Sequence, residues 1–164
     1  MNSNKEPLTQ AQAMNRAAAL CSRSEQATGD IREKLLKWGL DAQAAHAVLA
    51  ELINQGFIDD RRFARAFTRD RFMFNGWGRI KIAHQLRQKG VASELIDEAM
   101  GAIEDEQYRD KLMDILRSKW RTVKGREPRA AWAAMMRFAA SRGFEADIAS
   151  ACVKQVTRLD EADD

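Results

Sequence analysis

Apolar residues recur at helical spacing along almost the whole chain, and stretches that alternate apolar and polar residues are almost absent. Two prolines and nine glycines punctuate the pattern, and the segments between them carry apolar residues three or four positions apart. This periodicity is typical of amphipathic helices with one side facing a core. The sequence therefore predicts an all-α protein of about nine helices.

Short-range capping signals place several helix ends. Thr9, followed by Gln12 three residues later, forms a capping-box pattern before the first predicted helix. Asp41 is a typical N-cap residue for the third helix, and Pro128 suits the first turn of the eighth. Helix stops are predicted at four glycines, Gly39, Gly56, Gly90 and Gly143.

The helical pattern repeats itself about every fifty residues. Gly39, Gly90 and Gly143 are 51 and 53 residues apart, and apolar residues follow each glycine at positions +1, +5, +9 and +13. Matching residue types at one spacing indicate an internal repeat. Each repeat is predicted to contain three helices, with a glycine stop between its second and third helix.

A three-helix unit of this size has a thin core. Such units lean on their neighbours, so we expect an elongated, curved array that offers a long surface and no deep pocket. Three repeats are expected between a disordered N-terminus and an acidic disordered tail, with the divisions 1–8, 9–58, 59–105, 106–158 and 159–164.

Positive charge is concentrated in the middle of the chain. The stretch 61–90 holds nine Lys or Arg residues against the single acid Asp70, which gives it a net charge of +8. The residues before it sum to −2 and those after it to −3, so the overall charge is only +3. A field of this kind attracts a polyanion, or a partner with an acidic groove.

The candidate binding residues are the cations of this stretch together with one tryptophan: Arg61, Arg62, Arg65, Arg69, Arg71, Trp77, Arg79, Lys81, Arg87 and Lys89. Arg61, Arg65 and Arg69 would lie one above another on a helix, where like charges repel by roughly a few tenths of a kcal/mol per pair. A bound anion explains such a stack better than a merely solvated face, which is the alternative.

Parts of the basic region also have a structural explanation. Arg87 and Lys89 lie near the end of a predicted helix, where the helix dipole favours cations in any case. Trp77 between two glycines could stack on an exposed base or on a partner side chain, or it could pack down and anchor the turn. A second basic run, either a binding surface or a loop, comprises Arg117, Lys119, Arg121 and Lys124.

The residue types that catalysis needs are not grouped in this sequence. His46 and His84 have no neighbours at metal-ligand spacing, and Cys21 has no nearby base to activate it. Cys21 and Cys152 are expected to be reduced core thiols rather than a disulfide. We therefore expect no catalytic, metal or cofactor site, and a protein that is not an enzyme.

Two further expectations concern location. No window approaches the run of about 18 apolar residues that a membrane span needs. The first residues also lack the apolar core of a signal peptide, so a cytoplasmic protein without a membrane partner is expected.

A set of motifs occurs in a fixed order along the chain: Gly56-Phe57-Ile58-Asp59-Asp60, Arg62-Phe63, Gly76-Trp77-Gly78, Lys81-Ile82 with Leu86, and Lys89-Gly90-Val91. Together with the earlier segments Cys21–Glu25 and Ile31–Gly39, this set resembles the RecX family of bacterial regulators of the RecA recombinase. The similarity covers about residues 10–158 and is sharpest over 56–91. Several elements in one register make it more specific than a single short motif.

The resemblance implies three tandem three-helix repeats that bind RecA and its single-stranded DNA filament. It implies that the protein usually inhibits filament growth, strand exchange, ATP hydrolysis and coprotease activity, with some direct DNA affinity. Arg62, Lys81 and Lys89 are carried over by the motif, whereas the other cations rest on charge and spacing. No pattern for base readout is present, so DNA binding should not be sequence-specific. We expect a monomer.

Two other functions fit the same sequence. A stand-alone helical DNA-binding protein would bind duplex DNA selectively without RecA. An α-solenoid adaptor would use its basic face to bind an acidic protein and would not bind DNA.

Overall fold

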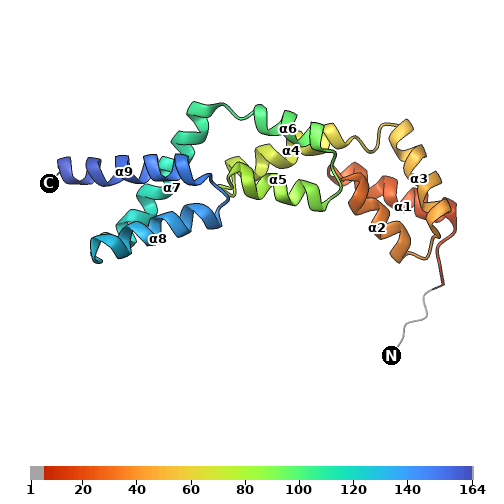
Figure 1. The fold of residues 1–164 in the computed structure, drawn as a ribbon. Helices are drawn as coiled ribbons and strands as arrows, with labels where there is room; N and C mark the ends of the chain where they lie inside the picture. Colours follow the sequence, from red (N-terminus) through yellow and green to blue (C-terminus); the bar gives the residue numbers. More distant parts are fainter. Residues whose placement is uncertain (1–5, 164) are drawn as a thin grey trace. The chain divides into compact units, whose positions relative to one another are not determined.

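The computed structural model describes residues 6–163, and every regular element in that range is an α-helix (Figure 1). The all-α prediction is therefore confirmed. None of the helices in the described range is long and apolar enough to cross a bilayer. The described residues form nine helices: α1 (Gln10–Arg23), α2 (Thr28–Lys37), α3 (Ala42–Asn54), α4 (Asp60–Met73), α5 (Arg79–Gln88), α6 (Ser93–Gly101), α7 (Asp105–Val123), α8 (Pro128–Ser141) and α9 (Ala146–Asp163).

The helix ends follow the capping signals of the sequence. The Thr9 hydroxyl accepts the Gln12 N–H at 3.1 Å, and the Gln12 side chain accepts the Thr9 N–H at 2.9 Å, which completes a capping box on α1. The Asp41 carboxylate accepts the Ala44 N–H at 2.7 Å at the start of α3. Pro128 occupies the first turn of α8. These three predictions are confirmed.

The predicted glycine stops have the left-handed backbone that ends many helices. The φ angles of Gly39, Gly56, Gly90 and Gly143 are 99°, 77°, 80° and 89°. Residues with a side chain rarely adopt this conformation, and glycine has no Cβ to oppose it. The recurrence of such a glycine at corresponding points is the structural basis of the sequence repeat.

Both termini are more ordered than expected within the described range. Residues 1–5 of the predicted disordered N-terminus lie outside that range, but Leu8 packs on the core and donates its N–H to the Trp38 carbonyl at 2.9 Å. At the other end, α9 continues to Asp163, where we expected a disordered tail. Its last turns are held because α9 packs along α7 and Asp160 lies 3.9 Å from the Lys124 ammonium group.

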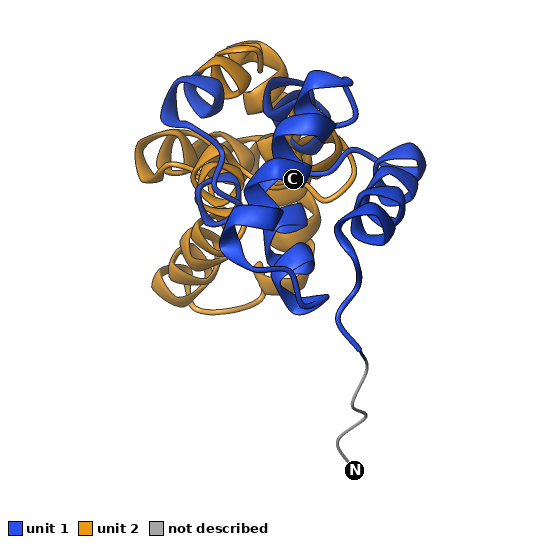
Figure 2. Ribbon diagram, turned by 90° about the vertical axis from the view of Figure 1, so that its right-hand side faces the viewer, with its two compact units in different colours: residues 1–67, 86–97 blue, residues 68–85, 98–164 orange. Residues whose placement is uncertain are grey.

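The described residues fall into two compact units (Figure 2). Unit 1 comprises residues 6–67 and 86–97, and unit 2 comprises residues 68–85 and 98–163. Helices α4, α5 and α6 each contribute residues to both units. The repeat boundaries expected at 58/59 and 105/106, and the expected curvature, therefore stay predictions.

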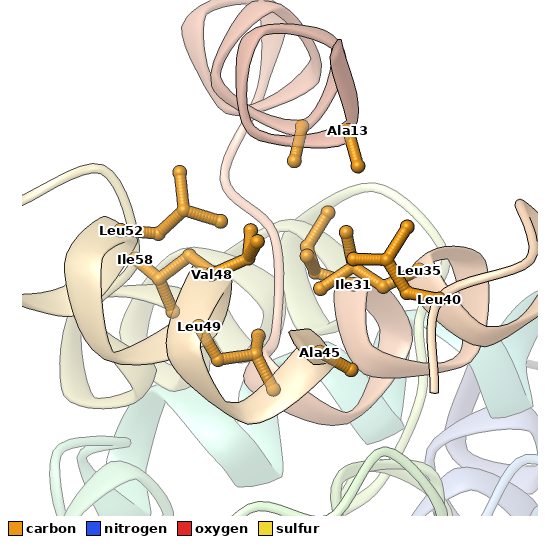
Figure 3. Close-up of a cluster of buried hydrophobic side chains, with 10 residues drawn as sticks. Ala13, Ile31, Leu35, Leu40, Ala45, Val48, Leu49, Leu52 and Ile58 are labelled. Atoms are coloured by element: carbon orange, nitrogen blue, oxygen red, sulfur yellow. The ribbon is translucent and has the colours of Figure 1, made fainter. Parts of the chain in front are cut away.

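Each unit contains a bundle with its own apolar core. In unit 1, α1, α2 and α3 pack together around Ile31, Leu35, Val48 and Leu52, as Figure 3 shows. In unit 2, α7 packs against both α8 and α9, and the side chains buried there include Leu112, Leu116, Met135, Val153 and Val156. The helical apolar stripes of the sequence thus form the two cores.

A closely packed glycine joint occurs in each unit. In unit 1, a Cβ added to Gly29 at the start of α2 would overlap the Lys89 carbonyl oxygen. In unit 2, a Cβ added to Gly78 before α5 would overlap the Gly143 carbonyl group. The Gly78 N–H donates to the Arg142 carbonyl at 2.7 Å. In unit 1 the start of α2 therefore lies against the end of α5, and in unit 2 the start of α5 lies against the end of α8.

We expect Gly78→Ala to lower the free energy of unfolding by about 1–3 kcal/mol, because the added methyl group meets backbone atoms that cannot move aside locally. Gly101→Ala is the matched control, since a Cβ at Gly101 meets nothing within 4 Å. Denaturant unfolding of both variants measures the difference. Equal stability of the two variants would show that the joint is not tightly packed.

Candidate nucleic-acid interface

Arg62, at the start of α4, is held by an acid of unit 1. Its guanidinium Nε lies 2.5 Å from Glu25 Oε1, and one terminal nitrogen donates to the Gly56 carbonyl at 3.1 Å. The side chain therefore ties the start of α4 both to the α1–α2 connection and to the turn before α4. Its charge is matched within the protein.

Lys89, directly after α5, also pairs with an acid of unit 1. Its ammonium group lies 2.8 Å from Asp30 Oδ2, and 5.9 Å from the ring centroids of both Phe63 and Phe67. The side chain is 28% exposed. A cation that pairs with a carboxylate and covers two aromatic rings stabilises the contact between α2 and the end of α5.

Arg79, the first residue of α5, is at the centre of a polar network in unit 2. Its side chain is 21% exposed and lies 2.9 Å from Asp105 and 3.3 Å from Glu145. The guanidinium carbon lies 3.9 Å from the Tyr108 ring centroid. The buried Tyr108 hydroxyl accepts the Arg79 backbone N–H at 3.0 Å and donates to the Glu145 carboxylate.

These three side chains have partners within the fold that the sequence-based interpretation did not include. Arg62, Arg79 and Lys89 were expected to face a polyanion, but each is paired with a carboxylate that is distant in the sequence. The net charge of the stretch 61–90 could not show these ion pairs, because the acidic partners lie outside that stretch in the sequence. The ion pairs give these three residues contacts that support the fold, and their role in binding a partner stays a prediction.

The Tyr108 hydroxyl has a testable titration. Burial raises its pKa, and the hydrogen bond to the Glu145 carboxylate raises it further. Because the ionised form is disfavoured in the folded protein, the buried neutral hydroxyl stabilises the fold below the ordinary tyrosine pKa of about 10. This stabilisation is lost as pH rises above that value. The chain has one tyrosine, so the ultraviolet absorbance of tyrosinate reports on Tyr108 alone.

We expect no tyrosinate signal from the folded protein at pH values where the denatured chain, near its ordinary pKa of about 10, is already ionised. Folding is followed in parallel by circular dichroism. A native titration that coincides with the denatured one would contradict the buried hydrogen bond.

The other cations of unit 1 remain candidates for partner contact. Arg61 and Arg65 lie on exposed positions of α4, four residues apart, and Arg87 is exposed in the last turn of α5. Arg69 continues the same spacing on the part of α4 that belongs to unit 2, where it lies 3.4 Å from the neighbouring Asp70. Their role in binding stays a prediction.

Two of the predicted cations lie beside the Trp77 ring in unit 2. The Arg71 guanidinium carbon lies 5.1 Å from the centroid of the indole, and the Lys81 ammonium nitrogen lies 4.5 Å from it. The Trp77 backbone N–H also donates to the Arg71 carbonyl at 3.1 Å. Trp77 is half-buried, so the contacts favour the anchoring role over a fully free stacking platform.

Most of the second basic run is helical rather than a loop, because Arg117, Lys119 and Arg121 belong to α7 and Lys124 directly follows its last residue. Arg117 lies 3.2 Å from Asp114, and Lys124 lies 3.9 Å from Asp160. Lys119 instead lies 5.2 Å from the Phe138 ring centroid on α8.

A groove in unit 2 brings Lys119 of the second basic run together with residues that were not predicted from the sequence. It has a volume of about 430 Å³, and the side chains around it include Phe74, Lys111, Lys119, Phe138 and Arg142. One signal could have pointed to Arg142: it directly precedes Gly143, as Lys89 directly precedes Gly90 in the preceding repeat.

No group of three or more His, Cys, Asp or Glu residues in the described range is arranged to hold a metal ion. Both cysteines are free thiols, with Cys152 buried and Cys21 half-buried. Burial raises the pKa of both thiols, which keeps them protonated near neutral pH.

The sequence matches two models of one family in consecutive segments. Residues 59–100 match the second three-helix domain of RecX, and residues 105–153 match its third three-helix domain. Together the two segments cover more than half of the chain. The chain belongs to the RecX family.

Curated relatives carry the name regulatory protein RecX. The protein from Halorhodospira halophila is 39% identical over 84 residues, which is 51% of this chain and 52% of the relative. The Streptomyces coelicolor protein is 28% identical over 151 residues, 92% of this chain and 79% of the relative. The Deinococcus radiodurans protein is 29% identical over 139 residues, 82% of this chain and 65% of the relative. Against two of these three RecX proteins, the match spans less than two thirds of their length.

Solved RecX structures share the fold. The crystal structure of RecX from Lactobacillus salivarius superposes with a TM-score of 0.81 at 16% identity, over 90% of this chain and 96% of that one. A crystal structure of regulatory protein RecX also gives a TM-score of 0.81, at 23% identity, over 89% of this chain and 71% of that one. The all-α array of three-helix repeats is thus the RecX fold.

Several RecX-like motif residues make contacts within the fold. Arg62 pairs with Glu25 of the α1–α2 connection, Lys89 pairs with Asp30 of α2, and Lys81 lies over the ring of Trp77. Much of the RecX-like pattern at 56–91 is therefore explained by the folding of the chain. The residues that contact a partner need not be those of the motif.

Proposed function

We propose that this RecX-family chain is a non-enzymatic regulator of homologous recombination and DNA repair. In this proposal it binds RecA and the RecA–single-stranded DNA filament. It modulates, and usually inhibits, filament growth, ATP hydrolysis, strand exchange and coprotease activity. It acts in the cytoplasm, as a monomer, and its direct contacts with DNA are not sequence-specific.

The match of residues 59–100 and 105–153 to consecutive RecX domains carries the proposal. The exposed cations of α4 support it, because Arg61, Arg65 and Arg69 recur every four residues on a helix that carries only two acids. A helical face of this kind suits the phosphates of DNA or an acidic surface of a partner protein.

The proposal is tested by the rate of ATP hydrolysis by RecA on single-stranded DNA. The purified chain, added at substoichiometric to equimolar amounts at low salt, should slow the steady-state rate. Addition before and after filament assembly separates an effect on growth from an effect on existing filaments. An unchanged rate in both orders of addition would count against the function.

Direct DNA binding in the absence of RecA separates the alternatives. Fluorescence anisotropy with labelled single-stranded and duplex DNA should give weak, salt-dependent binding without sequence preference. Selective duplex binding would instead indicate a stand-alone DNA-binding protein. Absence of DNA binding at every salt concentration, together with an unchanged RecA rate, would indicate an adaptor for an acidic protein.

A further inference from the structure

The groove in unit 2 lies where the connection after α4 meets α7 and α8. Phe74 stands at its rim with 83% of its surface exposed, the highest value among the large apolar residues of the described range. Ile115 and Phe138 supply apolar lining from α7 and α8. An aromatic ring left so exposed contributes little to the core and is accessible to a partner.

Three cations line the same groove, and none of its ten described lining residues is acidic. Lys111 donates to the Met73 carbonyl at 2.8 Å, and Arg142 donates to the Asn75 carbonyl at 3.0 Å. Lys119 and Arg142 lie 5.2 Å and 5.1 Å from the Phe138 ring centroid.

These contacts fix where the three cations lie without neutralising their charge. A backbone carbonyl and an aromatic ring each attract a cation, but neither carries the full negative charge of a carboxylate. This separates the groove from Arg62, Arg79 and Lys89, whose charges are matched by carboxylates. The groove is therefore a preorganised site for an anion beside an exposed ring.

We propose that this groove binds a single strand of DNA, with one base stacked on Phe74 and the flanking phosphates held by Lys111, Lys119 and Arg142. A cationic channel with aromatic stacking positions is how single strands are bound without sequence preference. A duplex keeps its base faces inside the stack and cannot present one to Phe74. The inference rests on the proposed function, since it assigns to this groove a contact with the DNA strand of the RecA filament.

The test uses fluorescence anisotropy of a labelled oligothymidylate with the full chain, without RecA, at low salt. Phe74→Ala and Phe74→Leu should each weaken binding by about 5- to 100-fold, the loss of one stacked base. Phe74→Trp should keep or increase the affinity, because the larger ring still stacks. Lys119→Gln should weaken binding and make the log–log dependence of affinity on salt shallower by about 0.7 for each phosphate that is no longer neutralised.

Ile80→Ala is the matched control, because Ile80 is 55% exposed in the same unit and does not line the groove. It should bind like the original chain. All these side chains are partly or fully exposed, and thermal melts should show only small changes in stability.

Three outcomes would overturn the inference. If Phe74→Leu binds as well as the original chain, the ring is an apolar anchor for a protein partner. If every Phe74 variant binds normally, the strand contacts another surface. If the original chain does not bind the oligonucleotide at low salt, the groove is not a DNA site.

The RecA ATP hydrolysis assay on the same variants separates this inference from the proposed function. If the original chain inhibits RecA but the Phe74 variants bind DNA normally, the DNA-binding role of the groove is contradicted and the proposed regulation of RecA is supported. If DNA binding depends on Phe74 but the chain has no effect on RecA, the groove is supported as a DNA site and the regulation of RecA is contradicted.

Discussion

Arg79→Ala is expected to lower the free energy of unfolding by about 2–4 kcal/mol, because Arg79 is the shared partner of two carboxylates and an aromatic ring. The Arg79 side chain is 21% exposed, so the Glu145 carboxylate and the Tyr108 ring would lose their common partner in a partly buried site. The loss is smaller than for a fully buried pair because Asp105 is itself solvated. Denaturant unfolding monitored by circular dichroism measures it.

Two further variants separate charge from geometry at this position. Arg79→Lys keeps the charge but cannot reach both carboxylates with a planar fork, so an intermediate loss is expected. Arg87→Ala removes an exposed cation from the same helix and should change stability by less than about 0.5 kcal/mol. A normal stability of Arg79→Ala would contradict the structural importance of its ion pairs.

The double reversal Arg65→Glu with Arg69→Glu is expected to weaken binding to the RecA–single-stranded DNA filament by about 10- to 100-fold at low salt. Each reversal replaces an attraction for phosphate or acid by a repulsion, and surface charges act mainly through such long-range fields. Both side chains are exposed, so the melting temperature should change little. The difference in affinity should shrink as salt is raised.

The matched control is Arg32→Glu with Lys34→Glu on α2, which changes the net charge by the same amount at exposed positions outside the basic stretch. If both double variants weaken binding equally, only the net charge matters and α4 is not a specific contact. A large fall in melting temperature of the α4 variant would show that its arginines are structural.

The helices could be predicted from sequence because their signals are local. Thr9 with Gln12, Asp41 and Pro128 act within one turn of the helix they start, and a glycine with positive φ ends a helix whatever lies beyond. The repeat followed from the same signals, because corresponding glycines recur at one spacing. Local chemistry thus determined most of the fold.

The site was harder to predict because its charges are paired across the fold. Asp30 and Lys89 are 59 residues apart, and Arg79 and Glu145 are 66 apart. Charge counted along a segment cannot show which cations such partners neutralise. The groove was missed for the same reason: Phe74, Lys111 and Arg142 come from three distant segments, and only packing of α7 and α8 brings them together.

The C-terminal tail also differs from what its local sequence predicts. The acidic residues at the end of the chain suggested disorder, yet α9 continues through them because its apolar side packs along α7. Tertiary packing can hold a helix whose residues would not form a stable helix by themselves.

The central claim is that the partner of this chain is the RecA–single-stranded DNA filament. The most direct measurement is the anisotropy of the fluorescently labelled chain, titrated in parallel with bare single-stranded DNA and with RecA filaments assembled on the same DNA. We expect clearly tighter binding to the filament than to the bare strand, with the difference reduced by the Arg65→Glu, Arg69→Glu variant. Equal affinity for both, or binding to the bare strand alone, would contradict the claim.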